Sequence, residues 1–529
     1  MSRISPTTSD ELPAGEAIAE SLQVKGTRTA WVSWFAGFLL LAAGWALVTP
    51  INGFPDEADH VYRAVSVVRG EIFPHIGPYT HGTGAITDVP VTIRNGGLRI
   101  DCGERLTQDS QCQPAGPGRS SSVTVETSEG RRFPLYYALV GWPSLAFPDQ
   151  TGWFLMRLVN AVLCSAFLAS GAYVLFSMCR RPPVLAAGLF VGLTPLAVDL
   201  AGSVNPSGLE VATAFCVWAV VLALVHGTSS LPPRRVIGIG AVSSVALVAS
   251  REPGFVWIVL AVALALISAT PERRAEFVRA RSTRVLLACA GGATLVMAAW
   301  SVAFRSFDTF HTPPASATGF GPAVSASYRH VGRLLQQTFA YLGYLAIPPP
   351  RVAELCWALA VLAIVGLAVV TNRRVGIAVL LGCAIVLVMP FVIEVATYSS
   401  RGLSGWQGRY TLPFAVGLPL LAVAPTRPKL HEKRFVLPIA VAVVVLTVVA
   451  QYAVFKNAWG ALVDPRWYVP FGDVLFALGA VVVIASVAWA DRRWRRAIAS
   501  APTRDQPPTR DQPPARDQPP ARDQVVDAR

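Results

Sequence analysis

Long apolar runs recur along most of this chain, and they constrain its fold more than any other feature. A run of about 20 apolar residues crosses the hydrocarbon core of a membrane as one helix. With 53% hydrophobic and 15% charged residues and a mean hydropathy of +0.47, the chain belongs to the polytopic membrane class. We therefore expect an all-α bundle of about twelve membrane-spanning helices. The expected spans are 29–49, 153–177, 184–203, 206–227, 236–250, 254–270, 285–304, 352–371, 375–395, 410–425, 435–454 and 472–490.

Arginine and lysine cluster between the expected spans, which gives the orientation of the chain. With a cytoplasmic N-terminus, every inner connection is basic, as the positive-inside rule requires. These connections are Arg180-Arg181, Arg234-Arg235, 273–284, Arg373-Arg374, 427–434 and 492–496. The net charge of +13 is thus a topology signal, and no nucleic-acid partner is expected. We expect a multi-pass plasma-membrane protein with both termini in the cytoplasm.

Three regions follow from this pattern. A polar segment, 1–28, precedes a transmembrane domain, 29–495, whose first outer loop covers 51–150. The tail, 496–529, repeats Arg-Asp-Gln-Pro-Pro and has almost no apolar content, so we expect it to be disordered.

The long outer loop carries local signals of its own. Glu57 to Arg69 has apolar residues at helical spacing and predicts a helix lying on the membrane. The stretch 89–100 alternates around Asn95-Gly96 and predicts a β-hairpin, and 121–127 adds to a small β-rich insertion. Pro134 to Phe147 is apolar but interrupted by Pro143, which indicates an interfacial or re-entrant helix.

Two of the eight cysteines, Cys102 and Cys112, lie in this hydrophilic loop. In an extracellular loop we expect them to form a disulfide that closes a short ring, with two free thiols as the alternative. The other six lie in or beside apolar runs, where a thiol acts as a small hydrophobe.

A dense group of ionisable residues follows the first span. Asp56, Glu57, Asp59 and His60 lie within five consecutive positions, and Arg63 follows one helical turn after Asp59. A carboxylate at the outer mouth of a bundle can take a proton from a sugar hydroxyl during glycosyl transfer. The alternative is a solvated loop acid, or an N-terminal cap at Asp56 for the helix that follows.

A second group lies between the expected spans 375–395 and 410–425, and comprises Arg401, Gln407, Arg409 and Tyr410. Arginine can bind two oxygens of a lipid phosphate at once and stays charged near the membrane. The alternative is an ordinary interfacial anchor, since arginine and aromatic residues favour that position.

A third group, Arg251-Glu252, sits between two short apolar runs, where ionisable residues are costly and suggest function, or pairing with other polar groups of the bundle. Asn205 is a weaker candidate, because Asn-Pro-Ser-Gly is also an ordinary turn signal with Pro206 starting the next helix. Glu394, near the outer end of its span, would face the same cavity or serve a structural role. The acids would be compatible with a divalent cation, although the sequence does not require one. Phosphate-binding loops, dinucleotide fingerprints, zinc motifs and nucleophile elbows are missing from the sequence.

Four motifs resemble a known family: Pro55-Asp-Glu-Ala-Asp-His60 with Tyr62-Arg63, Phe133-Pro-Leu-Tyr-Tyr137, Phe339-Ala-Tyr-Leu-Gly-Tyr-Leu345 and Gly405-Trp-Gln-Gly-Arg-Tyr410. They are similar to the actinobacterial branch of the DUF2142 family of uncharacterised membrane proteins, over about residues 30–490. That family is similar in turn to the GT-C superfamily of integral-membrane glycosyltransferases. This resemblance implies a helical bundle with a long first extracytoplasmic loop and a polyprenyl-phosphate sugar as donor. It also implies that Asp56 and Glu57 match the acidic pair of which one member is the general base.

The sequence thus leads us to expect an inverting glycosyltransferase of the cell envelope. Its partners would be a polyprenyl-phosphate sugar donor, a glycan or lipid acceptor, and membrane lipid. Arg409, with Arg401 or Arg251, would hold the donor phosphate, and His60 and Arg63 would orient the base or balance the phosphate charge. The alternatives are a transporter or flippase of lipid-linked saccharides and a non-catalytic envelope assembly protein. Transporters usually carry internal repeats, and we find none between the two halves of the chain.

Overall fold

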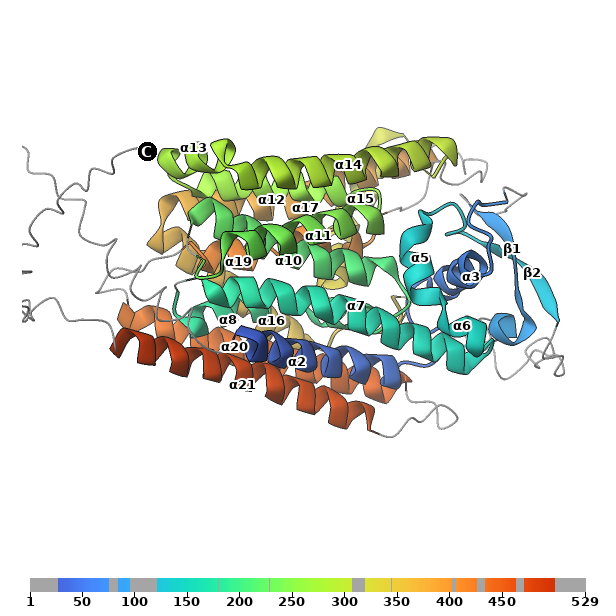
Figure 1. The fold of residues 1–529 in the computed structure, drawn as a ribbon, viewed down its shortest axis with the longest axis horizontal. Coiled ribbons are helices and arrows are strands. Elements are labelled where there is room, and N and C mark those ends of the chain that lie inside the picture. Colours follow the sequence, from blue (N-terminus) through green and yellow to red (C-terminus); the bar gives the residue numbers. More distant parts are fainter. Residues whose placement is uncertain are drawn as a thin grey trace, which may run out of the picture.

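Long apolar helices form most of the computed structural model, which describes residues 27–75, 84–95, 121–178, 180–227, 229–306, 319–343, 345–401, 406–425, 433–462 and 471–499 (Figure 1). In this part of the chain, eight helices are long and apolar enough to cross a membrane. They are α2 (Thr27–Val48), α7 (Gln150–Ser177), α10 (Pro206–His226), α14 (Arg281–Ala303), α16 (Arg351–Thr371), α17 (Arg373–Arg401), α20 (Lys433–Leu462) and α21 (Gly472–Ala499). The chain is built as a multi-pass membrane protein.

The expected count of twelve spans is not confirmed. The helices α8 (Pro182–Gly192) and α9 (Pro195–Ala201) make a ninth span if they are counted as one, but they are bent by 72°. Three expected spans correspond to helices that are shorter or less apolar. These are α11 (Pro233–Ser250), α12 (Gly254–Ser268), and the broken run of η2 (Gly408–Tyr410), α18 (Leu412–Ala415) and α19 (Leu418–Val423). Proline starts α8, α9 and α11 and is the second residue of α18 and α19, and its missing amide favours helix starts over continuous helices.

Glycines bring the first and last helices together. On α21, a Cβ at Gly479 would lie 2.7 Å from the amide nitrogen of Leu41 on α2. On α2, a Cβ at Gly44 would lie 2.9 Å from the carbonyl oxygen of Gly472. Small residues let helix backbones approach closely in a membrane, where packing takes over from the hydrophobic effect. The two ends of the transmembrane region are therefore joined into one bundle, with α10 buried almost completely at its centre.

Short elements cover one end of the bundle, which we call the loop end (Figure 1). They are α3 (Glu57–Val68), β1 (Ala85–Pro90), β2 (Ser122–Thr127), α5 (Pro134–Gly141) and α6 (Pro143–Ala146). The break between α5 and α6 falls at Pro143, as expected. The helix α13 (Pro271–Arg279) lies at the opposite end, and α15 (Phe320–Ala340) packs along α17.

The predicted hairpin around Asn95-Gly96 is wrong. Residues 91–95 are helical, and β1 pairs antiparallel with β2, so that Ala85 lies opposite Thr127 and Pro90 opposite Ser122. The local Asn-Gly signal is overridden by pairing with a strand about thirty residues away. The β-rich insertion is thus a two-stranded sheet in the described residues. Cys102 and Cys112 lie outside the described residues, as do 1–26 and 500–529.

Candidate functional site

An ion pair at the loop end joins two motifs that are 353 positions apart. Arg409 Nη2 donates to Asp56 Oδ2. Asp56 precedes α3 in the left-handed conformation (φ 55°, ψ 18°), and its side chain does not cap the helix. Asn52 serves the helix start instead, because its Oδ1 accepts from the Ala58 amide at 3.1 Å. The capping alternative for Asp56 therefore fails, and its carboxylate stays 37% exposed beside Arg409.

Asn205 holds the backbone that leads into Asp56. Its Oδ1 caps α10 by accepting from the Ser207 amide at 2.9 Å. Its Nδ2 donates to the Pro55 carbonyl at 2.9 Å, one residue before Asp56. The start of a central helix thus positions the acidic motif.

Arg409 lies on η2, which is held tightly against α15. The Gly408 amide donates to Gln337 Oε1 at 3.0 Å, and a Cβ at Gly408 would collide with the amide nitrogen of Thr338. Only glycine allows the backbone of η2 to come this close to α15, which explains the glycine in the Gln-Gly-Arg-Tyr motif. It leaves the Arg409 side chain 5% exposed.

Arg409 keeps unused hydrogen-bonding capacity. The Arg409 guanidinium stays charged in a protein, and it donates to both Asp56 and the Tyr410 hydroxyl through Nη2. Its Nε and Nη1 are buried and meet no hydrogen-bond partner within the described part of the chain. Unpaired buried donors of this kind are costly, and an anionic ligand would satisfy them.

A second guanidinium reaches the same place from the break between α11 and α12. Arg251 has an extended backbone there, and its guanidinium carbon lies 5.0 Å from the centre of the Tyr410 ring. The Arg409 carbon lies 5.1 Å from the same ring. Arg251 Nη1 also donates to Ser207 Oγ at 2.7 Å. One aromatic ring thus holds two cations next to Asp56.

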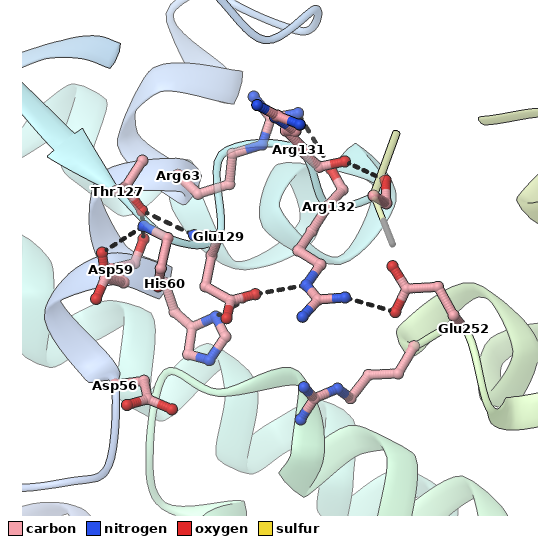
Figure 2. Close-up of polar contacts among 12 residues, drawn as sticks. Asp56, Asp59, His60, Arg63, Thr127, Glu129, Arg131, Arg132 and Glu252 are labelled. Atoms are coloured by element: carbon pink, nitrogen blue, oxygen red, sulfur yellow. Dashed lines mark hydrogen bonds and ion pairs between the residues drawn. The ribbon is translucent and has the colours of Figure 1, made fainter. Parts of the chain in front are cut away.

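Beside these residues, Arg132 bridges two carboxylates (Figure 2). Its Nε donates to Glu129 Oε2 at 2.7 Å and its Nη1 donates to Glu252 Oε2 at 2.8 Å. Burial acts to raise the pKa of Glu129, but Arg132 holds that pKa well below its usual range. The bridge ties the loop to the start of α12 and so fixes the position of Arg251, the neighbour of Glu252.

His60 points toward Glu129 in the same view (Figure 2), and its Nδ1 lies 3.0 Å from the Tyr137 hydroxyl and 4.0 Å from Glu129 Oε2. Burial lowers the pKa of His60 to about 4. The imidazole is therefore neutral at pH 7 and supports the site through hydrogen bonding rather than charge.

Glu57, the other acid of the pair, is fully buried and occupied. Arg157 of α7 donates to both of its carboxylate oxygens, each at 2.7 Å, and both side chains are 0% exposed. Arg157 also donates to the carbonyls of Ala46, Thr49 and Pro50 at the end of α2. This arrangement joins α2, α3 and α7.

Asp59 and Arg63 contact the loop backbone rather than each other. Asp59 Oδ1 accepts from the Ser128 amide at 2.8 Å, and burial raises the pKa of Asp59 to about 6. Arg63 donates to the carbonyls of Glu71, Ile72 and Arg132, and burial lowers its pKa to about 10. Arg63 is 2% exposed and holds three loop segments together.

The remaining candidates lie around η2. The carbonyl of Gln407 accepts from the Tyr410 amide at 3.0 Å, and Glu394 Oε1 accepts from the Trp406 amide at 2.6 Å. Arg401 ends α17, and its predicted role concerns a side chain outside the described part of the structure. No three His, Cys, Asp or Glu side chains among the described residues are grouped so that they could hold a metal ion.

Sequence reasoning missed Arg157, Glu129 and Arg132. Arg157 had a usable signal, because a charge inside an apolar run must find a partner. Glu129 and Arg132 belong to the charged stretch just before Phe133, but nothing local indicates that they pair with Glu252.

The sequence profile of a family described as predicted membrane protein (DUF2142) matches residues 39–418. The chain belongs to the DUF2142 family. The matched region contains Asp56, Arg251 and Arg409, so the site lies within the part shared with the family. No curated protein matches the chain.

Proposed function

We propose that this DUF2142 protein is an inverting glycosyltransferase with a GT-C arrangement. It moves a sugar from a polyprenyl-phosphate donor to a cell-envelope acceptor. The observation that carries the proposal is the pairing of Asp56 with Arg409, whose free donors lie beside a second arginine. A base next to an anion site is what transfer from a sugar phosphate needs.

Orientation follows from the basic clusters. In the proposed topology α11, α12 and the run from η2 to α19 complete twelve crossings, with about residues 51–150 outside and both termini in the cytoplasm of the plasma membrane. The loop end then faces outward, where lipid-linked sugars meet envelope acceptors.

In the proposed reaction the acceptor hydroxyl oxygen attacks the anomeric carbon as Asp56 takes its proton. The bond from that carbon to the phosphate oxygen breaks, and the phosphate leaves with the bonding electrons. The leaving phosphate gains negative charge, which Arg409 stabilises through Nε and Nη1 together with Arg251. Arg409 can hold the phosphate while its Nη2 stays on Asp56.

Within the acidic pair we assign the base to Asp56. Glu57 has no exposed surface and both of its oxygens are bound by Arg157, whereas the Asp56 carboxylate is partly exposed. Asp59, His60 and Arg63 support the loop around the base.

The test compares envelope glycans of a deletion strain complemented with wild type, Asp56→Asn or Asp88→Asn. Asp88 is an exposed acid on β1 at the same end and serves as the matched control. We expect Asp56→Asn, expressed at wild-type level, to leave the glycan defect of the deletion strain uncorrected, and Asp88→Asn to correct it. A wild-type glycan profile with Asp56→Asn would refute the proposal and leave transport or a non-catalytic assembly role.

The bent pair α8–α9 favours a second candidate, a transporter or flippase of lipid-linked saccharides. Broken helices mark transport sites near the bilayer midplane, and Asp199 in α9 is only 2% exposed. Reconstituted liposomes with a labelled lipid-linked sugar in one leaflet test this function. Movement across the bilayer that Asp199→Asn stops and Asp56→Asn leaves intact would favour transport over transfer.

A further inference from the structure

A cavity of about 540 Å³ lies away from the polar site, between α2, α8, α20 and α21. Its walls are mostly apolar, with side chains such as Phe38, Leu189 and Val483. The volume falls within the roughly 300–1,000 Å³ of ordinary ligand sites. Three of the four helices are long apolar spans, so the cavity lies at the depth of the lipid tails.

The length of the cavity matches one leaflet. Asp473 lines it at the start of α21 and Val483 lines it further along the same helix. Those ten residues rise about 15 Å, and the hydrocarbon core of a bilayer is about 30 Å thick. The cavity is therefore as long as the lipid tails of a single leaflet.

Two opposite charges mark one end. Lys456 and Asp473 both line the cavity and are exposed. Gly472 packs against Val48, the last residue of α2, so this mouth lies at the loop end. Among the described residues, no carboxylate lies within 4.0 Å of the Lys456 ammonium, so Lys456 and Asp473 do not neutralise each other. Asp473 Oδ1 accepts from the Val474 amide at 2.8 Å, and the side chain remains exposed.

We propose that this cavity binds one acyl chain of phosphatidylethanolamine, with the lipid phosphate at Lys456 and the lipid ammonium at Asp473. Bulk lipid is as apolar as the cavity walls, so burial of the tail gives little preference among lipids. Selection comes from the headgroup, because a zwitterion satisfies both charges while an anionic headgroup faces repulsion from Asp473. This inference does not depend on the transferase activity.

The lipid would also support the active end. Gln451 lines the cavity and donates from Nε2 to the Leu193 carbonyl at 2.6 Å, at the bend between α8 and α9. The next residue, Thr194, donates to the Thr338 carbonyl at 3.4 Å, and Thr338 packs on Gly408. A filled cavity therefore stabilises the wall that leads to η2.

The test is native mass spectrometry of the full chain, purified in mild detergent and offered equal amounts of phosphatidylethanolamine, phosphatidylglycerol and polyprenyl phosphate. We expect about one retained phosphatidylethanolamine per chain. Ala480→Leu narrows the cavity and should lower retention about tenfold, equivalent to 1.4 kcal/mol. Ala485→Leu on the same helix, at an exposed position that does not line the cavity, is the matched control and should retain the lipid.

Asp473→Asn tests the headgroup assignment. It should remove the preference for phosphatidylethanolamine over phosphatidylglycerol, a change of about fivefold for a contact of 1 kcal/mol. Equal retention by Ala480→Leu and Ala485→Leu would overturn the proposal. So would displacement of phosphatidylethanolamine by polyprenyl phosphate, or a preference that Asp473→Asn leaves unchanged.

Discussion

Replacing Glu57 by glutamine tests whether the two neighbouring acids have separate roles. Glu57→Gln keeps the side-chain volume but removes the charge that faces Arg157. Arg157 keeps three backbone carbonyl acceptors, yet its buried positive charge loses its counter-ion. Removing one partner of a buried pair costs about 3–5 kcal/mol, which is a large part of the 5–15 kcal/mol that stabilises a typical protein.

The matched substitution is Asp56→Asn. The Asp56 side chain is 37% exposed although Arg409 is buried, so water can reach the place of the lost carboxylate and the cost should be smaller than for the fully buried Glu57–Arg157 pair. We therefore expect Glu57→Gln to lower the unfolding temperature by several times the change seen in Asp56→Asn. The measurement is thermal unfolding of the purified variants in one detergent, followed by tryptophan fluorescence and by recovery of monodisperse protein.

A double variant distinguishes the effect of the unpaired Arg157 charge from the effect of the altered side-chain shape. Adding Arg157→Gln to Glu57→Gln removes the unpaired charge and should recover part of the loss, because a neutral pair avoids the desolvation of a lone ion. If Glu57→Gln instead unfolds at the wild-type temperature while glycan transfer is lost, the reasoning is refuted and Glu57 becomes the base.

Three further outcomes are expected. His60 has a pKa of about 4 in the folded protein, below its ordinary value of 6.5, so the unfolded chain binds the proton first and stability falls as the pH drops from 6.5 to 4. His60→Asn should lose this part of the pH dependence when unfolding is measured from pH 7 to pH 4. An unchanged pH profile would contradict the assignment. Gly408→Ala places a methyl group against the backbone of Thr338 and shifts η2. Donor turnover should fall by about 10²-fold, as expected when a binding group is displaced by about 1 Å, with expression unaffected. Full activity in the glycan assay would argue against the close contact between Gly408 and Thr338. Gly479→Leu forces α21 away from Leu41 of α2 and should destabilise the bundle by about 1–3 kcal/mol, whereas Gly460→Leu, at a position with open space, should be tolerated in the same thermal assay.

Local hydrophobicity determined most of the transmembrane architecture. Each expected span coincides with a helix or a broken helical run, because an apolar segment must satisfy its backbone within itself in lipid. The length and continuity of the shorter spans were harder to predict. Bends such as the one at Leu193-Thr194 depend on how proline-initiated helices pack against their neighbours.

Two local sequence signals in the outer loop, Pro143 and Asn95-Gly96, appeared equally strong, but only the prediction at Pro143 agrees with the structure. The break at Pro143 occurs as predicted, because the missing amide acts within the helix itself. The hairpin at Asn95-Gly96 fails, because 91–95 are helical and β1 pairs with the distant strand β2, a pairing that the local Asn-Gly pattern does not indicate.

For the site, the sequence by itself determined which residue types were available: two acids after the first span and an arginine in the Gln-Gly-Arg-Tyr motif. Only the tertiary structure decided their partners. In the structure, Asp56 pairs with Arg409, which lies 353 positions away, and Glu57 pairs with Arg157 inside the bundle. Adjacent acids with the same charge thus have different surroundings. Asp56 stands before α3 in a left-handed conformation and stays partly exposed beside Arg409, whereas Glu57 is the first residue of α3 and is buried against Arg157.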